Sequence, residues 1–284
     1  MTELDFIAAL RNLPLHSGAR GLNDDCAVLD IGGETLVLTH DAMAQGVHFR
    51  SDADLADVAW KLLASNLSDL AAKGAQPIGV LLSHSLSEDD DQFLSGLNAA
   101  LVQFNTTLLG GDSIAATQGR TFAITAIGRA THRPVPSRSG AVPGDNVYIT
   151  NCVGRAMLGF EGDPDHLKAF NRPEPRLAEG TALAPLVTAM MDISDGLLLD
   201  AFRLAQASHV TLAIDSALVP VADANRRDDC MRWGDDYELL FTLPAHVQPP
   251  VPATHIGSVE PMGFAPLMVD DNPVVNSQGL GFQH

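Results

Sequence analysis

The stretch DLADVAWKLLASNLSDLAAKG, residues 54–74, decides how the first half of the chain can fold. Apolar residues recur along it at helical spacing, which predicts one helix with Leu55, Ala59 and Leu62 on a common face. Asp69 follows Leu62 by seven residues, so it returns to that apolar face. A lone carboxylate there would cost several kcal/mol to desolvate unless it is paired or binds a metal ion. We therefore interpret Asp69 as a metal ligand, and the alternative is a buried structural carboxylate.

Six short carboxylate motifs, including the one that contains Asp69, stand where strands or helices are expected to end. They are Asn23-Asp24-Asp25, Thr39-His40-Asp41, Asn66-Leu67-Ser68-Asp69, Gly110-Gly111-Asp112, Asp192-Ile193-Ser194-Asp195 and Gly234-Asp235-Asp236. Aspartates also cap helices and fill turns, which is the role we expect for residues 89–91, 163, 165 and 270–271. Mg²⁺ prefers oxygen ligands and commonly ties protein carboxylates to substrate phosphates. The six motifs together therefore indicate a polynuclear metal–phosphate site.

The composition limits the classes of partner. The chain has 284 residues and a formal net charge of −18, and 27 of its 35 acidic residues are Asp. Such a surface repels nucleic acid and anionic membranes, and it favours a nucleotide that arrives as its Mg²⁺ complex. No run of 18 apolar residues and no leader-like amino terminus is present, so we expect a cytoplasmic protein with no membrane partner. Cys26, Cys152 and Cys230 show no metal-binding spacing and read as reduced thiols.

The order of elements predicts an α/β fold with two domains and mixed sheets. We expect strands at 26–31, 36–39, 78–82, 106–109, 121–128, 146–150, 189–193, 210–214, 238–243 and 255–259, and helices at 54–74, 88–104, 175–187 and 197–207. Between residues 130 and 144 the composition shifts to Pro, Ser, Arg and Gly, which is typical of a linker. We place the domain boundary there, with an amino-terminal domain at 1–133 and a carboxy-terminal domain at 134–284.

Several familiar catalytic motifs are absent from the sequence. There is no G-x-x-x-x-G-K-[ST] loop, no protein-kinase H-R-D or D-F-G motif and no G-x-S-x-G elbow. Ser194 has no plausible His partner nearby, so we favour a phosphate contact over a nucleophile. Arg138 is either a solvated linker charge or a bidentate phosphate ligand. His48 is either an ordinary core or surface histidine or a substrate contact.

Seven segments, taken in order, resemble the thiamine-monophosphate kinase family. They are residues 23–28 (NDDCAV), 39–49 (THDAMAQGVHF), 66–72 (NLSDLAA), 110–112 (GGD), 138–145 (RSGAVPGD), 191–197 (MDISDGL) and 234–242 (GDDYELLFT). None of them is specific alone, but their order and spacing hold over most of the chain. The resemblance implies the two-domain fold of the aminoimidazole-ribonucleotide synthetase and selenophosphate synthetase superfamily. It also implies ATP-dependent phosphorylation of thiamine monophosphate to thiamine diphosphate, and a homodimer formed through the amino-terminal domains.

The resemblance assigns roles residue by residue. The Mg²⁺ ions would be shared by Asp25, Thr39, Asp41, Asp69, Asp112, Asp192 and Asp195, with His40 offering a backbone carbonyl. ATP would contact Gly111, Asp112, Arg138 and Ser194, while His48 and Asp235 would contact thiamine monophosphate. Direct in-line transfer to an already ionised phosphate needs no strong general base, which agrees with a site made of aspartates. The alternatives are another ATP-dependent enzyme of the superfamily with a different acceptor, and a catalytically silent nucleotide- or metal-binding protein.

The chain departs from the family pattern at three positions. Asp235 replaces the usual Glu, His40 replaces a hydroxyl residue, and Leu280 stands where an aromatic residue is expected near the carboxy terminus. If the tail is extended, Phe282 points to the same side as Leu280, because side chains alternate along an extended chain. We therefore expect Phe282, rather than Leu280, to cover the substrate.

Overall fold

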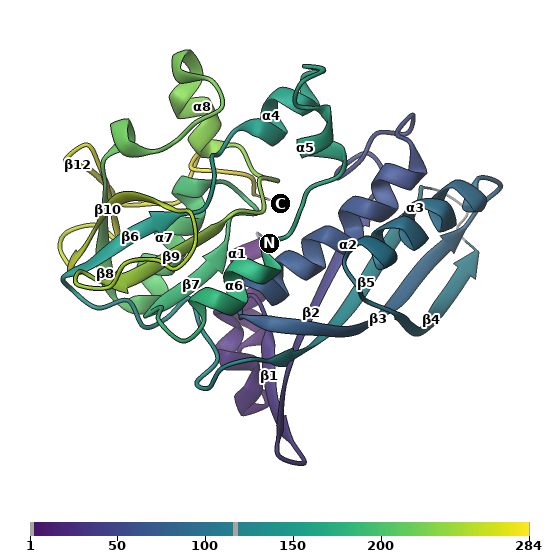
Figure 1. The fold of residues 1–284 in the computed structure, drawn as a ribbon, viewed down its shortest axis with the longest axis horizontal. Coiled ribbons are helices and arrows are strands. Elements are labelled where there is room, and N and C mark those ends of the chain that lie inside the picture. The colour runs from purple at the N-terminus through teal and green to yellow at the C-terminus, as the bar shows by residue number, and fades with distance from the viewer. Residues whose placement is uncertain (1–2, 116–118, 284) are drawn as a thin grey trace.

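The computed structural model describes residues 3–115 and 119–283, and it confirms the α/β fold class with two mixed sheets (Figure 1). The first half contains, in order, α1 (Glu3–Leu10), the 3-10 helix η1 (Ser17–Leu22), β1 (Ala27–Ile31), β2 (Glu34–Ala44), α2 (Leu55–Ala72), β3 (Ala75–Leu86), α3 (Asp90–Gln103), β4 (Leu108–Ala115) and β5 (Thr121–Ala130). The second half contains β6 (Asp145–Ile149), α4 (Arg155–Phe160), α5 (Leu167–Asn171), α6 (Leu177–Leu183), β7 (Ala189–Asp192), α7 (Leu197–Ser208), β8 (Val210–Ile214), η2 (Ser216–Leu218), η3 (Ala224–Arg226), α8 (Arg227–Arg232), β9 (Leu239–Pro244), β10 (Thr254–Pro261), β11 (Leu267–Val269) and β12 (Asn272–Val274).

The first sheet has the strand order β1-β2-β5-β3-β4. Its pairs are antiparallel except for β3 and β4, which run parallel. Helices α2 and α3 lie together on one side of this sheet, where Phe93, Phe122 and Ile124 are completely buried (Figure 1). Strand β4 forms the outer edge, and all eight of its residues are exposed.

Helix α2 lies at the centre of the molecule. Its first turn is capped by the Asp54 side chain, which accepts the backbone N–H of Ala56 at 2.8 Å. The helix ends before Gly74, whose φ of +57° is in the left-handed region that favours glycine. Its last turn carries Ala71 and Ala72 into the core of the second sheet, beside Phe241. The predicted helix is thereby confirmed, and it explains why one element contributes side chains to both halves of the molecule.

The second sheet has the strand order β12-β11-β8-β10-β6-β9-β7. Helix α7 packs its apolar residues, among them Leu198 and Phe202, into one core of this sheet. Helix α6 and the end of α2 contribute to a second core that contains Phe241. Strand β7 is the edge strand nearest to α2, so the loop after Asp192 faces the middle of the molecule.

The structure corrects several predicted element bounds. Strand β2 continues through Thr39, His40 and Asp41 to Ala44, and β4 continues through Asp112 to Ala115, so these two motifs lie inside strands rather than at their ends. Helix α6 covers only Leu177–Leu183 of the longer helix predicted at 175–187. Helices α4, α5 and α8 and strands β11 and β12 were not predicted. They are too short to show a clear period in the sequence.

Within residues 3–115 and 119–283, no helix combines the length and the apolar character needed to cross a membrane.

Candidate functional site

Three of the predicted ligands form a compact carboxylate cluster. Oxygen atoms of Asp25, Asp69 and Asp192 lie within 4.8 Å of one another. Asp25 comes from the loop before β1, Asp69 from the last turns of α2, and Asp192 from the end of β7. The cluster therefore joins the two halves of the chain at the end of the central helix.

Neighbouring hydroxyl and amide groups orient this cluster. Thr39 on β2 donates a hydrogen bond from its hydroxyl to Asp69 Oδ2, and Ser68 Oγ donates to Asp192 Oδ2 at 2.6 Å. The side-chain oxygen of Asn66 accepts the backbone N–H of Asp41 at 3.1 Å. The donors Thr39 and Asp41 lie on β2 and Ser68 lies on α2, within the motifs of residues 39–41 and 66–69. These two motifs therefore contact each other and the cluster.

The electrostatics of the cluster favour bound cations. Burial raises the pKa of Asp69 well above its usual value, and the charges of Asp41 and Asp192 raise it further. Burial, followed by the charge of Asp25, raises the pKa of Asp192 to about 8. Carboxylates placed this close repel one another unless protons or cations neutralise them. Carboxylate oxygens are the ligands that Mg²⁺ prefers, so the residues fit divalent cations.

A buried lysine, which the sequence analysis missed, holds one side of the cluster. Lys73 is completely buried and contacts Asp24 Oδ1 and Asp25 Oδ2, each at 2.5 Å. Arg20 pairs with Asp24 at 2.5 Å. Arg138 donates from Nε to Asp25 Oδ1 at 2.7 Å. The only available sequence signal was the pair of adjacent aspartates, which needs cations nearby if both side chains are buried.

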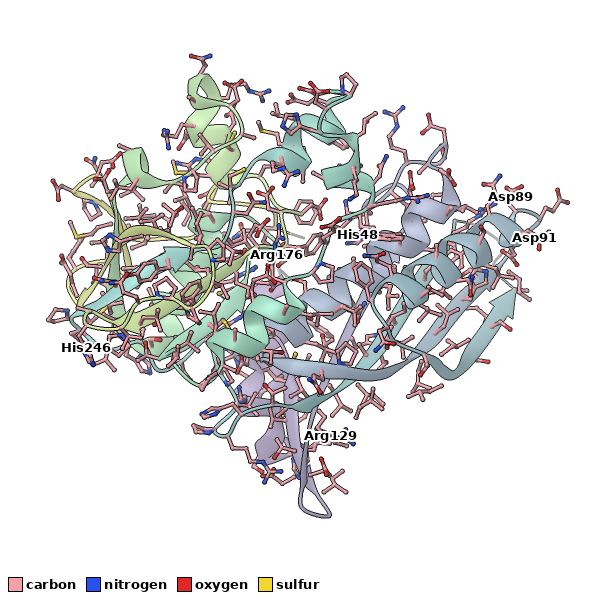
Figure 2. All side chains as sticks on the ribbon, viewed as in Figure 1. His48, Asp89, Asp91, Arg129, Arg176 and His246 are labelled. Atoms are coloured by element: carbon pink, nitrogen blue, oxygen red, sulfur yellow. The ribbon has the colours of Figure 1, made fainter. Side chains whose placement is uncertain are left out.

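A cavity of about 570 Å³ opens beside the cluster. Its lining includes the predicted residues Asp41, His48, Ser194, Asp195, Asp235 and Phe282, together with Lys61, Ser65, Phe160, Phe170, Trp233 and Tyr237. Asp41 connects the cavity to the cluster, because it lines the former and its charge raises the pKa of Asp69. His48 lies in the middle of the molecule, whereas Asp89 and Asp91 project from its edge (Figure 2). Asp89 stands at the N-cap position of α3 but makes no capping hydrogen bond with its side chain; Asp90 instead accepts the N–H of Ser87 at 3.1 Å.

Two loops of the second half pack tightly to form one wall of this cavity. The N–H of Asp235 donates to the carbonyl of Ser194 at 2.8 Å. A Cβ at Gly234 would lie 2.3 Å from that same carbonyl oxygen, so only glycine permits the approach. Asp200, another buried residue that the sequence analysis missed, accepts the N–H groups of Ser194 and Asp195 at 3.1 and 3.0 Å. The backbone of Ser194 and Asp195 is thus held by the N–H of Asp235 and by the Asp200 carboxylate.

Asp112 and the side chain of His40 lie away from the carboxylate cluster. The strand registers place Asp112 in one row with Ser83, Ala123 and Ala42, three strands away from β2. At the usual strand spacing this separation is roughly 14 Å. The side chain of His40 hydrogen-bonds Thr125 on β5 at 2.9 Å, which places it on the opposite face of β2 from Thr39 and Asp41.

The carboxy-terminal tail is not extended, so the prediction that Leu280 and Phe282 point to the same side of an extended chain is wrong. The N–H of Leu280 donates to the carbonyl of Ser277, and Gly279 has a φ of +72°. Because of this turn, Leu280 is 4% exposed and packs in the core against α7, while Phe282 is 45% exposed and lines the cavity. Phe282 therefore lines the cavity in place of Leu280 because of this turn, and not because side chains alternate along a strand.

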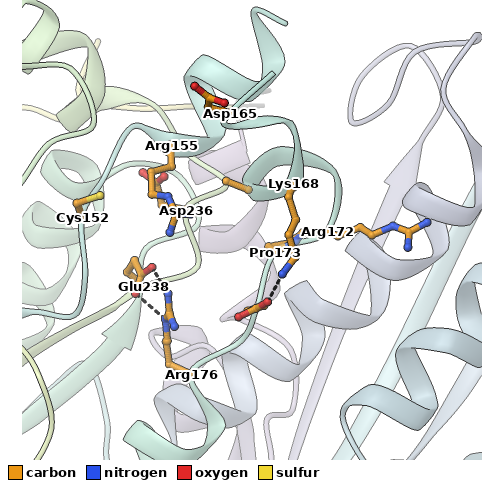
Figure 3. Close-up of a pocket in the computed structure, with 11 residues that line it drawn as sticks. Cys152, Arg155, Asp165, Lys168, Arg172, Pro173, Arg176, Asp236 and Glu238 are labelled. Atoms are coloured by element: carbon orange, nitrogen blue, oxygen red, sulfur yellow. Dashed lines mark hydrogen bonds and ion pairs between the residues drawn. The ribbon is translucent and has the colours of Figure 1, made fainter. Parts of the chain in front are cut away.

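A second cavity, of about 220 Å³, is lined by Lys168 and Arg172 around α5 and by Arg176, Asp236 and Glu238 (Figure 3). Most of its charges already have partners, since Arg176 pairs with Glu238 at 2.6 Å and Lys168 with Glu174 at 2.5 Å. Cys152 also lines this cavity, and burial raises the pKa of its thiol. A thiolate nucleophile is thus disfavoured there. The first cavity, which adjoins the carboxylate cluster, is the better candidate site.

We expect the metal-free protein to lose stability as the pH rises from about 4 to about 8. An unfolded Asp titrates near pH 3.9, but folded Asp192 titrates at about 8. Between these values the folded state binds more protons than the unfolded state, so rising pH favours unfolding. Melting temperatures in EDTA should fall across this range. Mg²⁺ should reverse the loss, because it binds the deprotonated folded state.

Asp192→Asn is the matched variant for this measurement. It should show a shallower pH slope and a smaller response to Mg²⁺. A metal-free melting temperature that rises steadily from pH 5 to 8 would contradict a buried Asp192 whose pKa is raised to about 8.

Comparisons with known proteins place this geometry in context. Residues 23–130 match the family described as AIR synthase related protein, N-terminal domain. The thiamine-monophosphate kinase of Escherichia coli (strain K12) is 37% identical over 252 residues, which cover 79% of this chain and 76% of that protein. The thiamine-monophosphate kinase of Methanospirillum hungatei is 31% identical over 268 residues, with 91% and 92% covered. A solved structure described as AaThiL complexed with AMPPCP and TMP superposes with a TM-score of 0.86 at 27% identity, and it covers all of this chain and 97% of the other.

Proposed function

We propose a mechanism for this chain, which belongs to the thiamine-monophosphate kinase family and is a thiamine-phosphate kinase. The γ-phosphoryl group of ATP would pass to thiamine monophosphate by direct in-line transfer. The site of transfer would hold several Mg²⁺ ions. The observation that carries the proposal is the cluster of Asp25, Asp69 and Asp192 beside a cavity of about 570 Å³. Both reacting groups are anions, so the main catalytic task is to neutralise their repulsion. A buried group of carboxylates suits that task only when it holds cations.

The proposed metal ligands are those that meet at the end of α2. Asp25, Asp69 and Asp192 would hold Mg²⁺ directly, Asp41 and Asp195 would extend the site toward the cavity, and Thr39 would orient Asp69. When bound, the ions would supply positive charge to the transferring phosphoryl group. Arg138 contacts Asp25, and its remaining N–H groups would donate to a phosphate of the nucleotide.

The cavity is the proposed site for thiamine monophosphate. His48, Asp235 and Phe282 line it, which supports them as the proposed acceptor contacts. The phosphate of the acceptor would face Asp41 and Asp195, and the rings would face the aromatic side chains. Leu280 would support this site from the core, because it is buried beneath the tail.

The nucleotide would extend across the first sheet, and a second copy of the chain would complete its site. The proposed ATP contacts Ser194 and Arg138 lie near the cluster, while Gly111 and Asp112 lie on β4 at the far edge of the sheet. Strand β4 also exposes Leu108, Leu109 and Ile114, at 51%, 51% and 59%. An exposed apolar edge strand of this kind favours pairing with another chain.

A homodimer through the amino-terminal domains would cover this strand. In the proposed division, residues 1–133 bind nucleotide and form the dimer, and residues 134–284 complete the acceptor site. Sedimentation equilibrium should give twice the mass of one chain. Ile114→Lys should shift the protein toward the monomer, and an unchanged mass distribution would contradict this interface.

Detection of the product tests the proposed reaction. The protein should convert thiamine monophosphate, ATP and Mg²⁺ to thiamine diphosphate, as measured by mass spectrometry. Free thiamine serves as the control acceptor and should not be phosphorylated. Binding of Mg-ATP without any thiamine diphosphate would instead indicate a different acceptor or a silent binding protein.

We expect Phe282→Ala to raise the KM for thiamine monophosphate and to leave the KM for ATP unchanged. An aromatic ring against a cationic or heteroaromatic ring contributes about 0.5 to 2 kcal/mol, which corresponds to roughly 2- to 30-fold in KM. Phe264→Ala is the control, because Phe264 is 88% exposed and does not line the cavity. If Phe282→Ala leaves the KM for thiamine monophosphate unchanged, the tail is not part of the acceptor site.

A further inference from the structure

Lys61 on α2 places its ammonium group at the aromatic end of the cavity. Its Nζ lies 2.6 Å from Asp235 Oδ2 and 3.7 Å from the centre of the Phe170 ring. The Lys61 side chain is only 7% exposed, whereas the Asp235 side chain is 33% exposed. The ammonium group is therefore held between a carboxylate and an aromatic face, inside the cavity proposed for the acceptor.

The surroundings of this ammonium group form a complete cation-binding subsite. The hydroxyl of Tyr237 donates to Asp235 Oδ1 at 3.0 Å, which fixes the carboxylate from its other side. The wall continues from Phe170 to Phe160, with ring centres 5.3 Å apart, and from Phe160 to Trp233, at 5.1 Å. Aromatic faces combined with a carboxylate are the usual means of recognising an organic cation. In this structure the occupant of the subsite is a side chain of the protein itself.

Helix α5, which carries Phe170, is fixed against α2 in this arrangement. Arg172 pairs with Asp57 on α2, and Trp60 Nε1 donates to the carbonyl of Pro173 at 3.0 Å. Helices α4 and α5 lie above α2 (Figure 1). These contacts do not involve Lys61, so they hold α5 and its Phe170 in place independently of the ammonium group.

We propose that Lys61 sets the affinity of the site for the thiazolium ring: its ammonium group occupies the cation subsite of Asp235 and Phe170 until the cationic ring of the acceptor displaces it. This inference rests on the proposed function. Two positive charges cannot share one carboxylate and one ring face without strong repulsion. The flexible four-carbon stem of lysine allows the ammonium group to move aside. Binding of the acceptor ring therefore includes the cost of breaking the contacts that Lys61 makes, and removing this internal competitor strengthens binding of the ring.

The test is calorimetric binding of thiamine monophosphate and of free thiamine to the full chain with Mg²⁺ and without ATP. Lys61→Met keeps an unbranched apolar side chain close to the length of the lysine stem and removes the ammonium group. We expect it to bind both ligands roughly threefold more tightly or better, since the lost contacts are one ion pair and one cation–π interaction. Lys61→Gln is the second variant, and circular dichroism confirms folding. Lys168→Met is the matched control, because the Lys168 ammonium pairs with Glu174 at the neighbouring cavity and the Lys168 side chain is 71% exposed.

A double-mutant cycle with Asp235→Asn separates occupancy of the subsite from a general charge effect. If Lys61 acts by occupying the subsite, Lys61→Met should have little effect in the Asp235→Asn background. Equal tightening in both backgrounds would overturn the proposal. Weaker binding of thiamine monophosphate with unchanged binding of thiamine would also overturn it, since Lys61 would then bind the phosphate. Wild-type protein that forms thiamine diphosphate, with a Lys61→Met variant that binds thiamine no more tightly, would refute the subsite and leave the proposed function standing.

Discussion

Replacing Asp69 by asparagine should leave a folded protein whose turnover is reduced at least about a thousandfold. The loss of one fixed charge at a site of charge development typically costs a hundredfold to a thousandfold. Asp69 lies within 4.8 Å of two further candidate ligands, so its loss disturbs a shared group of ions rather than one contact. Steady-state formation of thiamine diphosphate at saturating Mg²⁺ measures this effect.

The same substitution should act in the opposite direction on the stability of the metal-free protein. Burial and the charges of Asp41 and Asp192 raise the pKa of Asp69, so its ionised form destabilises the fold without cations. Asp69→Asn should therefore raise the melting temperature in EDTA while it abolishes turnover. Asp52→Asn is the control, because the Asp52 side chain is 70% exposed beside Arg50. More than roughly a tenth of wild-type turnover in Asp69→Asn would remove Asp69 from the metal site.

The sequence predicted the parts of the site that depend on local periodicity. Helix α2 and the burial of its Asp69 face follow from a spacing of apolar residues that survives in any compact fold. The meeting of Asp25, Asp69 and Asp192 was expected from the resemblance to a family, and the structure brings these three together. Periodicity alone could not have shown which of the six motifs meet, because that depends on the packing of α2 against both sheets.

The errors have physical causes that can be named. Glycines and acidic residues near Asp41 and Asp112 suggested strand ends, but edge and half-exposed strands tolerate polar residues, and β2 and β4 continue through both positions. The tail was treated as extended, although Gly279 permits a turn that separates Leu280 from Phe282. Lys61 and Lys73 carry no local signal, because a lysine on a helix is normally a solvated charge.

Replacing Lys73 by methionine should destabilise the protein by about 3 to 5 kcal/mol, the usual cost of removing one partner from a buried ion pair. Lys73 is completely buried and contacts Asp24 and Asp25, and its Nζ also donates to the carbonyl of Met190 on β7 at 3.2 Å. It therefore connects the end of α2 to both the cluster and the second sheet. Although burial alone would lower the pKa of Lys73, the charges of Asp25 and Asp24 raise it above its usual value, so the side chain stays charged.

Urea denaturation with and without Mg²⁺ measures this loss and distinguishes its causes. Methionine preserves the apolar stem. In the variant, Asp24 keeps its ion pair with Arg20, and Asp25 keeps its hydrogen bond from Arg138. If Asp25 binds Mg²⁺, the added ion supplies part of the missing positive charge, and the destabilisation should be smaller in Mg²⁺ than in EDTA. Lys168→Met removes an equal charge from an exposed pair and should change the free energy of unfolding by no more than about 0.5 kcal/mol. A Lys73→Met variant within about 1 kcal/mol of wild type in EDTA would show that the two arginines suffice, and that the buried lysine does not hold the cluster together.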